Sequence, residues 1–221
     1  MDNIALYLSC TDCFDHIYQI LHNWCEVLGA KFNIEKTEII PIGSPNHRVC
    51  VTNACKVNPM DQLQFEECIR IAADGNAVRY LGAWIGNNLN KSTPWEPVID
   101  KINKSLTLWK KAHLSMTGRR LIVQSVIGGC TQFLTKMQGM PDNIEVELTK
   151  IICDFIWEEN SSPRITMDLL QCPKDQGGLD LLNLKAYNEA IELVWLKSYL
   201  NFSPTCPEWA VMTDLILTAI A

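Results

Sequence analysis

The amino-acid sequence predicts an α+β fold, with short strands and a helix up to about Asn90 and helices in the remainder. Two observations support this prediction. In the first part, short apolar runs end at Gly, Pro or Asn residues, which is typical of strands joined by turns. From Trp95 onward, apolar residues recur at spacings of three and four, the period of an amphipathic helix. With 48% hydrophobic residues among 221, the chain can build a real core.

The first 90 residues are expected to form antiparallel strands with one helix packed on them. Ile4 to Leu8 is predicted as a short buried strand. Phe14 to Leu28 shows helical apolar spacing, and Gly29 is expected to end that helix. Further strands are predicted over residues 37–42, 69–72 and 78–85. The polar stretch over residues 43–64 is predicted as a loop.

The helical part is predicted to begin at Trp95. Six apolar residues fall on one side of that helix, and they are Trp95, Val98, Ile99, Ile102, Leu106 and Trp109. Both tryptophans are expected in the core, and a role as base-stacking platforms is the alternative. A second helix, residues 118–136, is apolar almost all round and is expected to be buried, with a kink or close contact at residues 128–129. A third helix is predicted to begin at Pro141, and Asn183 is expected to cap a last one.

Charge is distributed unevenly along the chain. The net charge of −6 argues against a protein built as a whole to wrap nucleic acid. Between Trp95 and Lys136, however, seven Lys and Arg residues stand against two acids, which leaves a net of five positive charges. Any contact with a polyanion is therefore predicted in the middle of the chain.

The ten cysteines show no paired framework. Cys10 and Cys13 form one CxxC without a second pair at zinc-finger spacing, so small buried hydrophobes are the expected role and a zinc or redox site is the alternative. The sequence shows neither a signal-peptide pattern nor the roughly 18 uninterrupted apolar residues of a membrane span. The protein is expected to be intracellular, in the nucleus or the cytoplasm, with free thiols and no membrane partner.

The N-terminal residues carry a motif with a possible catalytic carboxylate. The run from Met1 to Ser9, MDNIALYLS, resembles the A-D-D-x-x-x-Y-L-S motif of reverse transcriptases of non-LTR (LINE-like) retrotransposons. The resemblance implies that Asp2 matches the first metal-binding aspartate and that Asn3 replaces the second. Two Mg²⁺ ions at such a site activate the primer 3′-hydroxyl and steady the leaving pyrophosphate, and a neutral Asn is a weaker Mg²⁺ ligand than a carboxylate. The alternative is a surface aspartate.

Two further motifs follow in the order of that family. Residues 29–37 resemble its glycine helix stop followed by N-x-x-K-T, which implies that Lys36 helps to protonate or neutralise the leaving pyrophosphate. A solvated loop lysine is the alternative. The tripeptide Tyr80, Leu81, Gly82 resembles the hairpin that grips the primer, where glycine permits close backbone approach and tyrosine offers a flat surface.

Residues 80–129 carry the most informative part of the resemblance. A strand, a basic helix, a break over residues 114–118 and a second helix follow one another as in the polymerase thumb, which holds the template–primer duplex by its phosphates. The candidate phosphate contacts are Lys101, Lys104, Lys110, Lys111, Arg119 and Arg120. The two arginines, with Gly118 at a helix N-terminus, would combine side-chain charge with backbone N–H groups. For the lysines, a solvated helix face is the alternative.

The resemblance extends to about Leu200, since F-x-W, R-I and P-x-x-x-G-G-L follow over residues 155–179 with an expected structural role. It implies a partial palm over residues 1–90, a helical thumb-like region over 91–160 and a helical, truncated extension over 161–221. The implied activity is RNA-directed DNA synthesis with Mg²⁺, dNTPs, an RNA template and a DNA primer. The fragment is expected to be inactive without a missing upstream polymerase segment. The alternative is a non-catalytic helical module, derived from such an element, that binds nucleic acid or protein.

Overall fold

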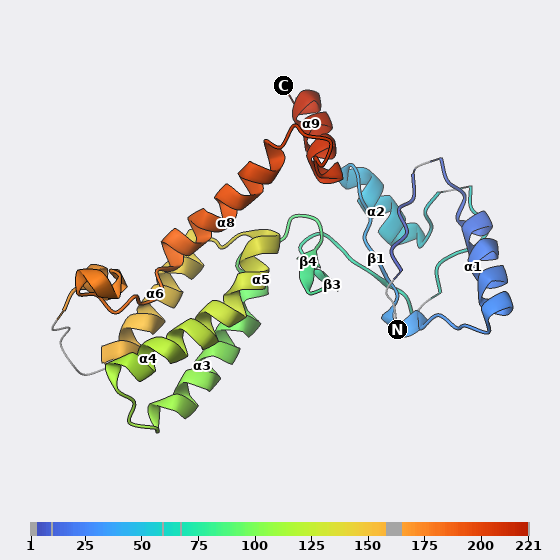
Figure 1. Ribbon diagram of the computed structural model, residues 1–221. Coiled ribbons are helices and arrows are strands. Elements are labelled where there is room, and N and C mark those ends of the chain that lie inside the picture. Colours follow the sequence, from blue (N-terminus) through green and yellow to red (C-terminus); the bar gives the residue numbers. More distant parts are fainter. Residues whose placement is uncertain (1–3, 10, 59, 67, 158–164, 221) are drawn as a thin grey trace. The chain divides into compact units, whose positions relative to one another are not determined.

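The computed structural model describes residues 4–9, 11–58, 60–66, 68–157 and 165–220. The chain divides into two compact units, Met1–Asn90 and Lys91–Ala221 (Figure 1). It is mostly helical, and its few short strands form two small sheets, which is compatible with the predicted α+β class. The second unit includes both the predicted thumb-like region, residues 91–160, and the predicted C-terminal extension, residues 161–221.

The described residues of the first unit form two α-helices, α1 (Phe14–Leu28) and α2 (Pro45–Ala54). Helix α1 has the predicted bounds, and Gly29 ends it with a left-handed φ of 61°. Helix α2 corrects the prediction of a loop over residues 43–64. Its start follows ordinary rules, since the Ser44 hydroxyl accepts a hydrogen bond from the His47 N–H group and proline occupies the first turn. This helix has few apolar residues, so the sequence shows no helical apolar period there.

In the part of the first unit that the structure describes, there are four short strands, β1 (Glu38–Ile39), β2 (Arg70–Ile71), β3 (Val78–Tyr80) and β4 (Ala83–Ile85). Strands β3 and β4 form an antiparallel hairpin. Strands β1 and β2 pair in parallel, so the expectation of antiparallel pairing is wrong for them. The strand predicted over residues 78–85 is in fact two, because Leu81 and Gly82 have φ values of 48° and 88° and reverse the chain.

The strand predicted from Ile4 to Leu8 is also wrong. These residues have no regular secondary structure, and their side chains are exposed. A strand needs a neighbouring strand to satisfy its backbone N–H and C=O groups. Within the described residues, both sheets consist of other segments, so the apolar run stays unpaired.

The second unit is built from helices. Its α-helices are α3 (Glu96–Lys110), α4 (Met116–Ile122), α5 (Gly129–Gln138), α6 (Asp142–Trp157), α7 (Met167–Gln171), α8 (Leu184–Tyr199) and α9 (Glu208–Ile220). Helices α3 to α6 gather around a common core, and α8 runs from this bundle to α9 (Figure 1). Fully buried apolar side chains form the core, among them Ile102, Ile127, Leu148 and Ile152.

The two tryptophans of the predicted thumb-like helix differ in burial. Trp95, at the end of a short 3₁₀ turn (Thr93–Trp95), is 1% exposed, as expected for a core residue. Trp109 is 43% exposed, so its expected place in the core is wrong. Trp109 keeps the apolar spacing of α3, but it lies in the last turn of the helix, where neighbouring helices do not cover it.

The helix predicted over residues 118–136 consists of α4, a π-helical turn (Val123–Gly128) and α5. Val123, Ile127 and Thr131, at spacings of four, are all 0% exposed and lie against the core. A π turn contains more residues than the 3.6 of an α-helical turn. Residues spaced by four therefore stay on the same side of the helix through this segment. It ends at Gly128, where a kink or close contact was expected. Leu121 and Phe133 are half exposed, so the segment is not buried all round.

Candidate nucleic-acid interface

Helix α3 separates an apolar side from a charged side. Ile99, Ile102 and Leu106 are buried in the core of the second unit. The four predicted lysine contacts are all exposed, and they are Lys101, Lys104, Lys110 and Lys111. Three of these lysines lie on one side of the helix, and Lys110 lies on another.

Lys101, Lys104 and Lys111 lie within about 80° of one another, on the side opposite the buried residues. We call these three residues the α3 lysine row. Along the axis the row extends about 15 Å, which matches about four base-pair steps of a duplex. Lys110 lies apart from it. Exposed ammonium groups in such a row can approach successive phosphates while they keep most of their hydration.

Arg119 is held inside the second unit. Its Nη1 group donates hydrogen bonds to the carbonyl oxygens of Phe155 and Ile156, at 3.2 and 2.9 Å, and its Nε group donates to the carbonyl of Leu114 at 3.3 Å. The first two acceptors belong to the last turn of α6, whose carbonyls have no partners within the helix. The guanidinium therefore caps α6 and complements its negative C-terminal end.

Arg120 is 9% exposed and pairs with Asp180. Its Nη2 group lies 2.5 Å from the Asp180 carboxylate, and its Nε group donates to the Asp180 carbonyl at 3.0 Å. The turn before Asp180 sets this geometry. Gly177 has a φ of 83°, and a Cβ atom on Gly178 would stand 1.9 Å from the Cys172 carbonyl oxygen. The G-G pair of the predicted motif therefore has the structural role that was expected for it.

The phosphate site predicted at the N-terminus of the second thumb-like helix also has internal partners. Ser115 caps α4, and its hydroxyl accepts the Gly118 N–H group at 3.2 Å. Because both arginines and the Gly118 N–H group are bonded within the unit, this region stabilises the second unit itself. Among the predicted contacts, the α3 lysine row is the group that the structure brings together on one exposed face.

Lys36 lies on a turn that its own motif builds. The Asn33 side chain accepts the Lys36 N–H group at 3.2 Å, and the Thr37 hydroxyl donates to the Asn33 carbonyl at 3.1 Å. The N-x-x-K-T sequence thus closes a 3₁₀ turn (Ile34–Lys36) and leaves the lysine side chain exposed. Asp2 and Asn3 lie outside the described residues, so the structure does not position the predicted catalytic carboxylate.

Tyr80, Leu81 and Gly82 form the tip of the β3–β4 hairpin. Tyr80 pairs with Ala83, which leaves Leu81 and Gly82 as a two-residue turn. Leu81 is 65% exposed and has a positive φ, a conformation that a residue with a Cβ atom rarely adopts. The predicted primer-grip tripeptide is therefore a tight, projecting turn.

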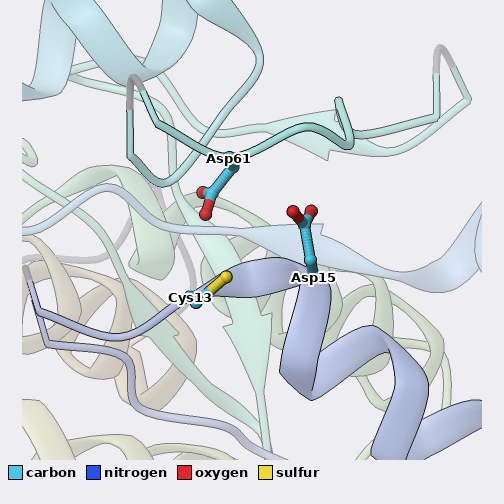
Figure 2. Close-up of side chains that lie close together, drawn as sticks. All are labelled: Cys13, Asp15 and Asp61. Atoms are coloured by element: carbon cyan, nitrogen blue, oxygen red, sulfur yellow. The ribbon is translucent and has the colours of Figure 1, made fainter.

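A cluster that the sequence did not predict joins the start of α1 to a distant loop. The Cys13 sulfur and carboxylate oxygens of Asp15 and Asp61 all lie within 4.8 Å of one another (Figure 2). Asp61 is 4% exposed, and its carboxylate accepts the N–H groups of Phe14 and Asn58 at 3.2 and 2.8 Å. It caps α1 from 47 residues away along the chain.

Asp15, on α1, forms a second set of hydrogen bonds between the same two segments. Its carboxylate accepts the Gln62 and Leu63 N–H groups at 3.0 and 2.9 Å, and these bonds lower the pKa of Asp15 below its ordinary value. Both carboxylates of the cluster are thus committed to backbone donors. The third member is a thiol, and Mg²⁺ prefers oxygen ligands. The cluster does not fit the Mg²⁺ site that the resemblance implies, and its arrangement suits a structural connection between α1 and residues 58–63.

In the described part of the chain, no helix combines the length and apolar character that crossing a membrane requires. No model of a known protein family matches the sequence.

Proposed function

We propose that the chain is the C-terminal palm and thumb portion of a reverse transcriptase of the non-LTR retrotransposon type, and that its second unit holds an RNA–DNA hybrid by the phosphates. The observation that carries this proposal is the α3 lysine row, on the exposed side of a helix whose other side is core. The order of the motifs in the sequence supports it, since the hairpin with Tyr80 at its tip directly precedes the helical unit.

The binding that we propose is weak and reads no base sequence. Lysines of the α3 row engage phosphates as point charges, and each engaged charge releases condensed counterions. The chain as a whole is acidic, with a net charge of −6, and repels a polyanion. We therefore expect binding only at low salt, with dissociation constants in the micromolar range or weaker, as for ordinary non-specific contacts. The site of action under this proposal is the nucleus or the cytoplasm.

The proposed parent activity is RNA-directed DNA polymerisation with Mg²⁺ and dNTPs, and we infer that this chain does not perform it alone. Such a site needs at least two carboxylates for its metal ions, and Asn3 stands where the family has the second of two adjacent aspartates. Purified protein should therefore extend no primer on an RNA template. Extension above the level of an Asp2→Ala control would contradict this inference.

The test of the binding proposal is a comparison of two triple variants. Lys101→Ala, Lys104→Ala and Lys111→Ala together remove the α3 row. The matched control removes three exposed lysines elsewhere in the same unit, at Lys150, Lys174 and Lys185. Both variants change the net charge equally, so a difference between them reports position.

Fluorescence anisotropy with a labelled RNA–DNA hybrid at low salt measures the affinity of each variant. We expect the row variant to bind at least about tenfold more weakly than the control, since it loses three of the proposed phosphate contacts. Equal affinities of the two variants would overturn the proposal for α3.

A further inference from the structure

A pocket of about 260 Å³ lies in the second unit, between the end of α5 and the middle of α8. The residues that line it come from these two helices and the turn after α5, and they include Thr135, Met137, Met140, Asn188, Glu192 and Trp195. The Trp195 indole N–H group donates a hydrogen bond to the Lys136 carbonyl at 3.0 Å. This bond connects α8 to the last turn of α5 beside the pocket.

Two buried side chains of the pocket carry polar atoms without a hydrogen-bond partner. Thr135 is 4% exposed, and Asn188 is 8% exposed. Among the described residues, neither the Thr135 Oγ1 atom nor the Asn188 Oδ1 atom has a partner. Such atoms are uncommon in folded proteins, because burial removes their bonds to water and returns nothing. Two of them in the lining of one pocket indicate that a bound molecule supplies the missing bonds.

The hydrogen bonds of the Asn188 amide define what that molecule must offer. The Asn188 Nδ2 group donates to the Glu145 carboxylate at 2.8 Å and to the Met140 sulfur at 3.3 Å. An ionised carboxylate can only accept, so it is the amide nitrogen that meets Glu145. The remaining Oδ1 atom is an acceptor. A ligand of this pocket must therefore bring an N–H or O–H donor to Asn188, and the Thr135 hydroxyl can accept a second one.

The charges around the pocket favour a donor that is positively charged. Glu192 lines the pocket, and Glu145 is bonded to Asn188. Lys136 also lines the pocket, so this group holds two carboxylates and one ammonium. Helix α5 ends at Gly139 beside them, and its C-terminal end adds partial negative charge from the last carbonyl groups. An ammonium group meets these conditions, because it combines positive charge with three N–H donors.

The other walls of the pocket are apolar and include Met137, Met140, Ile191 and Trp195. Thioether side chains adapt to an apolar body, and an aromatic face also attracts a cation. The two unpaired atoms are themselves shielded from solvent. A ligand therefore reaches them by displacing a flexible side chain at the rim, and Met137, which is 52% exposed, can move in this way.

We propose that this pocket binds a small organic cation, a primary ammonium on an apolar body. Its N–H groups donate to Asn188 Oδ1 and Thr135 Oγ1, and its body lies against Met137 and Trp195. Glu192 at the rim adds attraction for the positive charge. The site is independent of the proposed nucleic-acid contact, because it uses α5 and α8 and none of the α3 lysine row.

Titration of the isotope-labelled full chain with phenethylammonium, followed by NMR, tests the site. We expect saturable shifts of the Trp195 indole and Asn188 amide resonances, with a dissociation constant on the order of 1 mM, as for a ligand of this small size. Hydrocinnamate, which carries a carboxylate on a similar phenyl body, should leave both resonances unchanged. The absence of saturable shifts with phenethylammonium would overturn the proposal and would mean that ordered water alone bonds to the two atoms. Equal shifts with hydrocinnamate would also overturn it.

Variants at the floor of the pocket and at its rim locate the binding. Thr135→Val replaces the unpaired hydroxyl by a methyl group of similar size, so the circular dichroism spectrum should be unchanged. We expect this variant to bind phenethylammonium about fivefold more weakly, since the ligand loses one acceptor. Parent-like binding by Thr135→Val would contradict the proposal.

The rim is tested by Glu192→Gln, which should weaken binding by about two- to fivefold through loss of an exposed charge. Its matched control is Glu189→Gln, an exposed acid of the same helix that lies outside the pocket lining. The control should bind as the parent does. Equal weakening by the two variants would show that the pocket does not hold the cation.

Discussion

The lysines of α3 and the arginine pair of α4 lie close together in the sequence and carry the same charge, yet their surroundings differ. The α3 row projects from a helix whose other side is core, and its side chains are exposed. Arg119 and Arg120 turn inward and bond to the end of α6 and to Asp180. Positive charge in a sequence therefore predicts a polyanion contact only where no internal acceptor captures it. Substitution of the arginines should lower the stability of the second unit, whereas substitution of the α3 lysines should leave it almost unchanged.

The largest effect is expected on stability, for Arg120→Ala. This change removes a buried guanidinium and leaves the Asp180 carbonyl without its donor, so the free energy of unfolding of the second unit should fall by about 2–3 kcal/mol. Urea unfolding followed by circular dichroism measures it. Arg120→Lys keeps the charge and loses the two-point geometry, and it should lie between the alanine variant and the parent. An unchanged unfolding midpoint for Arg120→Ala would show that the pair with Asp180 contributes nothing.

A smaller loss is expected for Arg119→Ala. The carbonyls of Phe155 and Ile156 would then bond to water, and α6 would lose its C-terminal cap. The free energy of unfolding should fall by about 1–2 kcal/mol. Lys104→Ala, at an exposed position on α3, should change the same unfolding free energy by less than about 0.5 kcal/mol. If the two substitutions have equal effects on urea unfolding, the distinction between inward arginines and outward lysines fails.

The smallest effect concerns the first unit and depends on pH. Hydrogen bonds from the Gln62 and Leu63 N–H groups hold the pKa of Asp15 below its ordinary 3.8. The ionised carboxylate therefore stabilises the fold above pH 3.8, and this contribution disappears as the pH falls through the lower folded-state pKa. Asp15→Asn should be less stable than the parent at pH 6, and the difference should shrink in acid. Thermal unfolding between pH 2 and 6, roughly the range that brackets carboxyl titration, checks this, and a constant difference would contradict it.

Local signals in the sequence were sufficient for several elements. Gly29 ends α1 as predicted. Asn183 caps α8 through a hydrogen bond from the Ala186 N–H group, although α8 is followed by α9 and is not the last helix. Trp95 is buried before α3, as its position in the apolar pattern indicates. Each of these signals acts within a few residues, which is the range over which a sequence pattern determines conformation directly.

Partners far along the chain could not be predicted in this way. Asp61 caps a helix 47 residues before it, and the partner of Arg120 lies 60 residues after it. Strands β1 and β2 pair in parallel across the whole of α2. Nothing local distinguishes an arginine with such an acceptor from one that is free to meet a phosphate. For this reason the position of charge was predictable, but the division between exposed and internally bonded cations was not.

The salt dependence of hybrid binding tests that division most directly. On a plot of log affinity against log salt concentration, each engaged charge contributes close to one unit of slope. Removing Lys101, Lys104 and Lys111 together should therefore reduce the slope by about two to three units. Arg119→Ala, measured where the variant is fully folded, should leave the slope unchanged. A lower slope for Arg119→Ala together with an unchanged slope for the triple variant would contradict the account, since the arginine would then be the phosphate contact and the α3 row a solvated surface.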